Sequence, residues 1–360
     1  MSKIISLGTA VPSHKHRQTD ILEFMQQAYA MNAVENRKQR FLYQMSGIDS
    51  RYSPIPDYSL PMSGWEFYRQ NEHLEPFPSL ELRMQWYQQH AAPLSLAAIH
   101  NCISGKIPPQ EITHLITVSC TGMSAPGLDL QLMELLALPK HTYRTSLNFM
   151  GCYAAIHALK LADAICKNDT NARVVIVCTE LCTLHFQKEA TPDNIASTLL
   201  FGDGSAAALI THDAYDAGGL HLKGFYSEVV SKGNKDMAWE LSSKGFLMTL
   251  SGYIPELIEE DFEQLVQRAI NPLGFSIKDV HHWCIHPGGK RIVEAIQKSL
   301  KLNASDLQAS YKILRDYGNM SSPTLLFVLK EMMQQPMISP VFAAAFGPGL
   351  TMETFTAVYE

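Results

Sequence analysis

A cysteine able to act as a nucleophile occurs at Cys152, directly after Gly151 in the segment Asn148-Phe149-Met150-Gly151-Cys152. The apolar residues that follow, at positions 155, 156, 159 and 165, recur at helical spacing and predict a helix over residues 152–167. Because a helix N-terminus favours negative charge, the sequence predicts a lowered thiol pKa and a reactive thiolate. The alternative is an inert cysteine that only fills the core.

Two further motifs supply side chains that can assist a cysteine nucleophile. His286 is followed by Pro287, Gly288 and Gly289, and this turn would leave the imidazole at the tip of a buried strand, facing a cleft. Asn319 precedes a second apolar helix, where its side chain either donates to a substrate or only caps the helix. Together the three predict a thiolate held by an imidazole, and an oxyanion hole for a thioester carbonyl. Such a site would also stabilise the enolate that a malonyl thioester leaves on decarboxylation.

The elements that would position these residues alternate between strands and helices, which predicts an α/β fold with buried strands. The predicted strands cover residues 114–120, 174–180, 206–212, 281–286, 341–346 and 354–359, and the predicted helices cover 152–167, 254–270, 291–299 and 322–333. Residues 54–78 are rich in proline and aromatic residues and are interpreted as an irregular excursion.

An internal repeat relates the two halves of the chain. Adding 167 to the numbering places His114–Gly122 on His281–Gly289, Cys152 on Asn319 and Val174 on Val341. Few residues are identical, so a chance match of α/β hydropathy is the alternative. A duplicated strand–helix–strand unit would bring Cys152 and Asn319 together near a pseudo-twofold axis. We therefore place the halves at residues 1–212, with the cysteine, and 213–360, with the histidine and asparagine.

The amino-acid composition of the chain argues against several classes of function. The chain has 360 residues, a net charge of −6 and ordinary hydrophobic content, which disfavours nucleic acid or an anionic membrane as the main partner. No apolar run is long enough to span a bilayer, and the first residues lack the layout of a signal peptide. Seven cysteines without a CxxC pair suit a reducing compartment, and no zinc-binding pattern occurs. We expect a soluble cytoplasmic protein without a structural metal.

The sequence resembles the type III polyketide synthases of the chalcone and stilbene synthase family, within the thiolase-fold superfamily. The resemblance runs from Leu7 to the C-terminus and rests on five segments: Gly151-Cys152, LFGDG at Leu200–Gly204, HPGG at His286–Gly289, YGNMSS at Tyr317–Ser322 and FGPGLTMET at Phe346–Thr354. It implies a layered αβαβα fold built from two duplicated halves. It also implies a homodimer that condenses malonyl-CoA onto an acyl-CoA starter without a further cofactor.

The resemblance also implies residue roles. Cys152 would carry the acyl chain, and His286 and Asn319 would stabilise the enolate of malonyl-CoA, while Phe201 would separate the site from the coenzyme A tunnel. The starter-pocket positions are Thr121, Glu180, Cys182, His185 and Ser321. The cyclisation-pocket positions are Cys120, Ala125, Phe201, Met237, Trp239, Met248 and Pro348. Lys290, Arg291 and Arg51 are candidate ligands of the coenzyme A phosphates, although each can equally be a solvated charge.

Three of these positions depart from the family pattern. His185 replaces a smaller residue, and Ala125 stands where plant enzymes place a methionine that reaches across the dimer. Trp239 stands where they have glycine, and an inward indole would shorten the cavity. An inward Trp239 therefore predicts few extensions and a small pyrone or resorcinol; the alternative is an outward Trp239, because this loop aligns poorly.

Two other functions remain compatible with the sequence. One is a ketoacyl-carrier-protein synthase III-like initiation enzyme, which would use a malonyl carrier protein. The other is a catalytically silent thiolase-fold partner protein, which would have no need of all three residues Cys152, His286 and Asn319.

Overall fold

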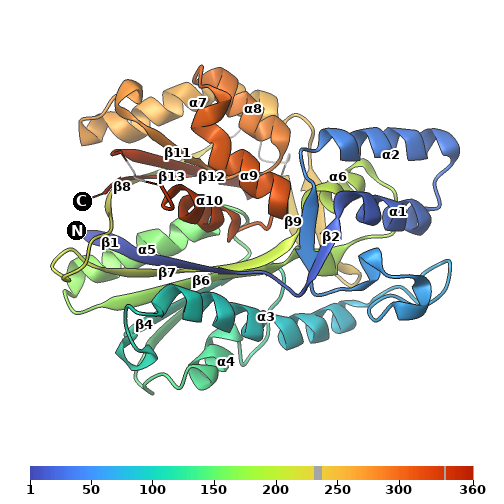
Figure 1. Ribbon diagram of the computed structural model, residues 1–360, viewed down its shortest axis with the longest axis horizontal. Helices are drawn as coiled ribbons and strands as arrows, with labels where there is room; N and C mark the ends of the chain where they lie inside the picture. The colour runs from blue at the N-terminus through green and yellow to red at the C-terminus, as the bar shows by residue number, and fades with distance from the viewer. Residues whose placement is uncertain (231–236, 336–337, 360) are drawn as a thin grey trace.

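The computed structural model describes residues 1–230, 237–335 and 338–359 (Figure 1). Its strands are β1 (Ser2–Ala10), β2 (His14–Arg17), β3 (Ser50–Ser53), β4 (His114–Ser119), β5 (Tyr143–Asn148), β6 (Arg173–Leu181), β7 (Asp203–His212), β8 (Leu220–Val229), β9 (Met237–Ser242), β10 (Gly245–Leu250), β11 (His282–Ile285), β12 (Val341–Gly347) and β13 (Thr351–Tyr359).

The α-helices of the described residues are α1 (Gln18–Tyr29), α2 (Ala33–Met45), α3 (Leu80–Ile103), α4 (Leu128–Leu135), α5 (Ala154–Asn168), α6 (Pro192–Leu200), α7 (Ile254–Ile270), α8 (Lys290–Ser299), α9 (Gln308–Tyr317) and α10 (Thr324–Met332). The four predicted helices correspond to α5, α7, α8 and α10. Residues 54–78, predicted to be irregular, contain two single 3-10 turns, η1 (Asp57–Ser59) and η2 (Met62–Gly64).

The main sheet shows the predicted repeat. Its strand order within the described residues is β11-β12-β13-β8-β1-β7-β6-β4-β5. In the first half β4 runs parallel to β6, which is antiparallel to β7, and β7 is antiparallel to β1. In the second half β11, β12, β13 and β8 repeat these orientations in the same order. The two halves meet where β1 pairs briefly with β8, so the pseudo-twofold axis passes between these strands.

The strands of the main sheet have helices on both faces, and their side chains point alternately to one face and the other. Helices and strands therefore stack in five layers. Val175 and Val177 of β6 face a core with α3, whereas Val174 and Ile176 face a second core with α5 and α10. On β12, Ala343 faces this second core, and neighbouring residues face a third core with α7 and α8. Figure 1 shows the resulting stack: α7 and α8 at the top, α5 and α10 between the two groups of strands, and α3 and α4 at the bottom. The predicted thiolase-like fold is confirmed.

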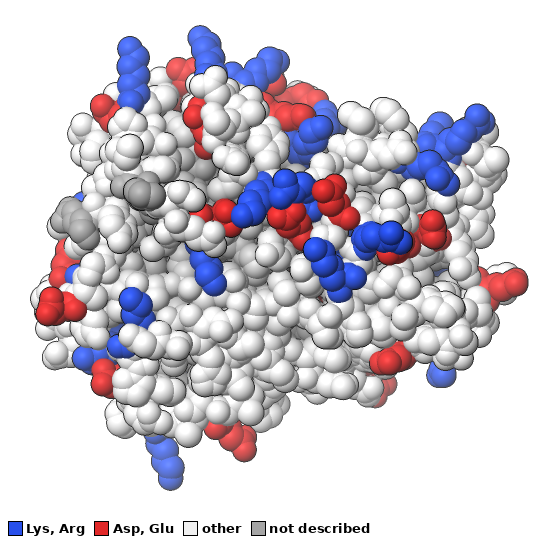
Figure 2. Space-filling view, in the orientation of Figure 1, with Lys and Arg blue, Asp and Glu red and all other residues white. Residues whose placement is uncertain are grey.

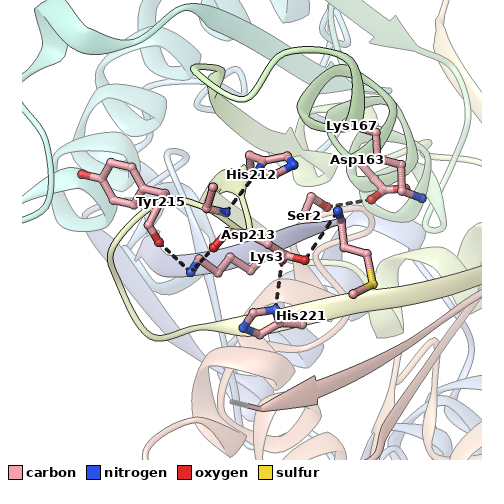
Figure 3. A network of polar contacts seen from close by, with 10 residues as sticks. Ser2, Lys3, Asp163, Lys167, His212, Asp213, Tyr215 and His221 are labelled. Carbon is pink, nitrogen blue, oxygen red and sulfur yellow. Dashed lines mark hydrogen bonds and ion pairs between the residues drawn. The ribbon is translucent and has the colours of Figure 1, made fainter.

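A polar network around the start of β1 holds the connection between the two halves (Figure 3). Lys3 of β1 donates through Nζ to the carbonyl oxygens of Asp213 and Tyr215, just after β7. The Asp213 carboxylate lies 2.9 Å from Nδ1 of His221 on β8. The chain segment that joins the two halves is therefore fixed to the N-terminal strand. None of the helices in the described ranges is long and apolar enough to cross a membrane.

Candidate active site

One cavity contains the three predicted catalytic residues. Cys152, His286 and Asn319 all line it, with Phe201, and its free volume is about 90 Å³. The cysteine comes from the first half of the chain, and the histidine and asparagine come from the second. The duplicated fold therefore brings the three side chains together, as expected from the repeat.

Cys152 is held by a turn that only glycine can form. Gly151 has a φ of +80°, and a Cβ at this position would lie 2.3 Å from Cδ of Pro348. The Gly151 N–H donates to Sγ of Cys120 at 3.0 Å. This turn places Cys152 two residues before α5, at the N-terminal end of a helix buried between the two halves.

The electrostatics of Cys152 differ from the expectation of a lowered thiol pKa. Burial raises the pKa of Cys152 to about 11, although hydrogen bonds from Ser321 and Asn319 act in the opposite direction. The predicted helix position is correct, but loss of hydration outweighs it, because a buried thiolate has lost the water that would stabilise its charge. At neutral pH the Cys152 side chain is therefore a neutral thiol.

His286 follows β11 directly, as predicted, and its backbone N–H donates to the carbonyl of Ala344 on β12. The imidazole is buried, and neither ring nitrogen has a hydrogen-bond partner among the described residues. Burial lowers the pKa of His286 to about 3, so the ring is neutral. Burial thus favours a neutral thiol and a neutral imidazole over the expected thiolate–imidazolium pair, and the imidazole offers a neutral base and an unused donor.

Asn319 is positioned by backbone pairing with the strand end that carries Phe201. The Asn319 N–H donates to the carbonyl of Leu200, and the Gly202 N–H donates to the carbonyl of Asn319, both at 2.9 Å. Its side-chain Nδ2 donates to the carbonyl of Gly288 at 3.1 Å, and its Oδ1 accepts the Ser321 N–H at 2.8 Å. The amide is therefore fixed in orientation, and the N–H of Nδ2 that does not bond to Gly288 is directed at the Cys152 thiol.

Glu180 lies behind the cavity wall, not in it. Its carboxylate accepts from the Cys120 N–H and the Thr121 hydroxyl, both at 2.8 Å, and from the Ser322 hydroxyl at 2.7 Å. Burial raises the pKa of Glu180 to about 7, although these hydrogen bonds lower it. The interpretation of Glu180 as a starter-pocket residue is corrected accordingly: it joins the segment of Cys120 and Thr121 to the start of the α10 helix.

Trp239 points into the cavity and forms an aromatic wall with two neighbours. Its Nε1 donates to the carbonyl of Cys120 at 2.7 Å. The His185 ring stacks on Phe246 with centroids 4.2 Å apart, and Trp239 meets both rings edge-on. His185 Nε2 lies 2.7 Å from the carbonyl of Thr121, and Nδ1 accepts the Phe246 N–H at 3.2 Å. With both nitrogens occupied and its pKa lowered to about 3 by burial, His185 is a neutral wall residue.

The remaining pocket residues divide into two groups. Seven of them line the cavity, namely Cys120, Thr121, Cys182, Ser321, Met237, Met248 and Pro348. Ala125 does not: it is exposed on the surface of this chain, after β4. Its predicted place in the cyclisation pocket would therefore require a second copy of the chain.

The candidate ligands of the coenzyme A phosphates lie in two different environments, two on the surface and one buried. Lys290 and Arg291 begin α8, next to the cavity-lining Gly288, and form surface ion pairs with Glu294 and Glu256. Exposed pairs of this kind contribute little free energy, so both cations can turn to a phosphate. Arg51 has a different environment: its guanidinium is buried, lines the cavity, and donates to Gln18 and to the carbonyl of Phe201. It supports the Phe201 backbone from within the cavity wall, and its role as a ligand of the coenzyme A phosphates stays a prediction.

Sequence reasoning missed several residues of the wall. Phe246 and Leu250 line the cavity with Met248, and the three alternate along β10. A period of two in this short strand was the available signal. A second group, Ile21, Met25 and Tyr58, comes from α1 and η1, whose approach to the cavity has no signature in the sequence.

Comparison with known proteins agrees with this geometry. The N-terminal domain of the chalcone and stilbene synthases matches residues 1–214, and the C-terminal domain matches residues 222–358. The chain belongs to the chalcone and stilbene synthase family. A member of this type III polyketide synthase family from Bacillus subtilis (strain 168), named "Putative chalcone synthase", is 29% identical over 376 residues, covering 100% of this chain and 99% of that protein.

Solved structures of polyketide synthases have the same fold. PKS-I from the brown alga Ectocarpus siliculosus superposes with a TM-score of 0.94 at 24% identity, covering 100% of this chain and 98% of that one. The C-terminal type III polyketide synthase domain of Steely1, a type I/III hybrid from Dictyostelium, superposes with a TM-score of 0.91 at 26% identity, covering 99% of both chains.

Proposed function

We propose that this type III polyketide synthase loads an acyl group from a coenzyme A thioester onto Cys152 and extends it with malonyl-CoA by decarboxylative Claisen condensation. The observation that carries the proposal is the convergence of Cys152, His286 and Asn319 in one buried cavity. Coenzyme A thioesters are the only co-substrates it requires, and no metal or redox cofactor takes part in it.

The resting protonation states suggest how the residues divide the work. The neutral His286 takes the Cys152 proton as the thiol sulfur attacks the starter thioester, so the thiolate forms only when it is needed. The enolate that malonyl-CoA leaves on decarboxylation then accepts hydrogen bonds from His286 and from the Asn319 N–H that does not bond to Gly288. The enolate carbon attacks the acyl carbonyl on Cys152. The apolar walls exclude the water that would hydrolyse the thioester or protonate the enolate.

We further propose a cytoplasmic homodimer. β5 forms the exposed edge of the main sheet, with Tyr143 70% exposed, and the exposed Met123, Ala125 and Leu130 lie on the adjoining loop and helix. An uncovered sheet edge next to exposed apolar side chains is suited to pairing with a second copy. All seven cysteines are free thiols, in keeping with a reducing compartment.

A turnover experiment separates this function from the two alternatives. The purified protein, given malonyl-CoA and a panel of aliphatic and aromatic acyl-CoA starters without any carrier protein, should release carbon dioxide and extended polyketides, detected by mass spectrometry. Extension that begins only when malonyl carrier protein is supplied would favour an initiation synthase. Absence of both acylation and decarboxylation would favour a silent partner protein.

Trp239 predicts the length of the product. The indole lines the cavity and takes up part of its space, so we propose that the protein makes a small pyrone or resorcinol. Trp239→Gly is expected to lengthen the longest product by at least one two-carbon unit, as measured by mass spectrometry of products from one starter. Trp239→Phe keeps most of the bulk and is the control, with product length unchanged. An unaltered product profile in Trp239→Gly would contradict the role of the indole.

A further inference from the structure

One part of the active-site cavity is lined by α1, η1 and their neighbours, away from the elements that carry the catalytic residues. We call this part the α1 pocket, and its lining residues are His16, Ile21, Met25, Tyr58, Phe186 and Thr198. Each of the six is at most 8% exposed. A passage to solvent at this place would expose them, so the α1 pocket ends inside the protein core.

The polar side chains of the α1 pocket are already hydrogen-bonded within the protein. The ring nitrogens of His16 lie 2.8 Å from Oγ of Ser59 and 3.0 Å from a backbone carbonyl oxygen. Burial lowers the pKa of His16 to about 4, so the ring is neutral. The Tyr58 hydroxyl donates to the carbonyl of Thr183 at 3.0 Å, and the Thr198 hydroxyl donates to the carbonyl four residues earlier on α6 at 2.9 Å. The pocket therefore offers a ligand mainly carbon surface.

The α1 pocket contains no charged side chain. Figure 2 shows Lys, Arg, Asp and Glu side chains on the outer surface over α1 and α2, at the right of the view. Arg51 is the only residue of these four types among the described residues that line the cavity. Its guanidinium donates to Gln18 and to the carbonyl of Phe201. The six residues of the pocket therefore provide no counter-ion for a charged ligand.

The α1 pocket and the aromatic wall of Trp239 begin at two consecutive residues that face different partners. The His185 ring stacks on Phe246 in the wall formed with Trp239. The next side chain, Phe186, instead meets two aromatic rings of α1 edge-on. An acyl chain attached to Cys152 therefore has two directions within the cavity, one limited by the indole of Trp239 and one along the α1 pocket.

We propose that the α1 pocket selects the starter by holding an unbranched aliphatic acyl chain that carries no hydroxyl or charge. The inference rests on the proposed acylation of Cys152. In that step the Cys152 sulfur bonds to the acyl carbon, the bond from this carbon to the coenzyme A sulfur breaks, and coenzyme A leaves as a thiol with the proton that Cys152 gave up. Each CH₂ group that leaves water for the carbon surface is worth about fourfold in binding. A hydroxyl would instead lose its water and find no partner.

The first test compares starters that differ in a single property. Acylation of Cys152 by butyryl-, hexanoyl-, octanoyl- and decanoyl-CoA is followed by rapid quenching and intact-protein mass spectrometry. The second-order rate constant should rise by about fourfold for each CH₂ group until the pocket is filled. The matched starter ω-hydroxyoctanoyl-CoA should react at least roughly tenfold more slowly than octanoyl-CoA. Rates that do not depend on chain length, or equal rates for the last two starters, would overturn the inference.

Two substitutions on α1 should change the pocket in opposite directions. Ile21→Phe adds bulk and should lower acylation by decanoyl-CoA at least roughly tenfold, while acylation by butyryl-CoA changes less than about twofold. Met25→Ala removes bulk and should move the preferred starter to a longer chain. Leu22→Phe is the matched control, because Leu22 is equally buried on α1 but is not among the described residues that line the cavity. If Ile21→Phe and Leu22→Phe change the ratio of the decanoyl and butyryl rates equally, the inference is wrong.

Binding to the Cys152→Ala protein separates this inference from the proposed function. Calorimetric titration with decanoyl-CoA should give a dissociation constant that rises at least roughly tenfold when Ile21→Phe is added and stays the same when Leu22→Phe is added. If this pattern is found but no acyl-CoA acylates Cys152 in the unaltered protein, the α1 pocket stands and the proposed function fails. If aromatic starters are loaded and extended as fast as aliphatic ones, the proposed function stands and the inference fails.

Discussion

Cys152→Ala is expected to abolish covalent loading and to lower polyketide formation by more than about 10⁴-fold. The reason is that Sγ of Cys152 is the only protein atom that bonds to the growing chain in the proposed mechanism, and it lies at the buried start of α5. Intact-protein mass spectrometry after incubation with a starter acyl-CoA measures the loading, and product analysis measures the turnover.

Cys182 offers a matched control for this variant. It is a free cysteine that lines the same cavity, and the proposed mechanism gives its thiol no chemical step. Cys182→Ala should therefore retain acylation of the enzyme, although the starter preference can shift. An acyl adduct of normal yield in Cys152→Ala, or its loss in Cys182→Ala alone, would show that the nucleophile has been assigned to the wrong cysteine.

His286→Ala is expected to reduce malonyl-CoA decarboxylation and starter loading by about 10²- to 10⁴-fold.

Burial holds the pKa of His286 at about 3, below the ordinary value of 6.5. The imidazole therefore stays unprotonated as the pH falls through 6, and it can still accept the Cys152 proton where an exposed histidine is already charged. Wild-type loading should accordingly persist at pH 5.5, measured as the initial rate of acylation.

Asn319→Ala separates the two roles assigned to His286. Asn319 is proposed to stabilise the enolate but not to accept the thiol proton, so its loss should slow decarboxylation while affecting iodoacetamide alkylation of Cys152 much less than His286→Ala does. Alkylation at an unchanged rate in His286→Ala would contradict the role of the imidazole as the base for Cys152.

The sequence predicted the architecture well because a repeat and a hydrophobic periodicity can both be identified by comparing short segments of the chain. The shared offset of 167 residues correctly related β4 to β11, α5 to α10 and β6 to β12. The GC and GNMSS segments precede the buried helices α5 and α10, and HPGG follows the buried strand β11. A turn that allows only one backbone conformation restricts its residues strongly, so it can be identified in the sequence. Gly151 is the clearest case, since a side chain there would collide with Pro348.

The remaining features depend on contacts between distant segments. Whether Trp239 faces inward depends on its hydrogen bond to the Cys120 carbonyl and on the rings of His185 and Phe246, none of which a local pattern reveals. Glu180 was assigned to the starter pocket through the family resemblance, and Arg51 to a coenzyme A phosphate because it is a cation. In the structure both are buried and form hydrogen bonds to distant segments, which no local pattern reveals. Burial also reversed the expected direction of the Cys152 pKa shift: loss of hydration raises this pKa, whereas the helix N-terminus was expected to lower it.

The most direct test of the central claim is intact-protein mass spectrometry, with peptide mapping, of the enzyme quenched during a single turnover with a starter acyl-CoA and malonyl-CoA. The proposed mechanism predicts that the starter acyl mass appears on Cys152 and then grows on this same residue by successive two-carbon ketide units. A starter adduct on any other residue, or one on Cys152 that never grows when malonyl-CoA is present, would contradict it.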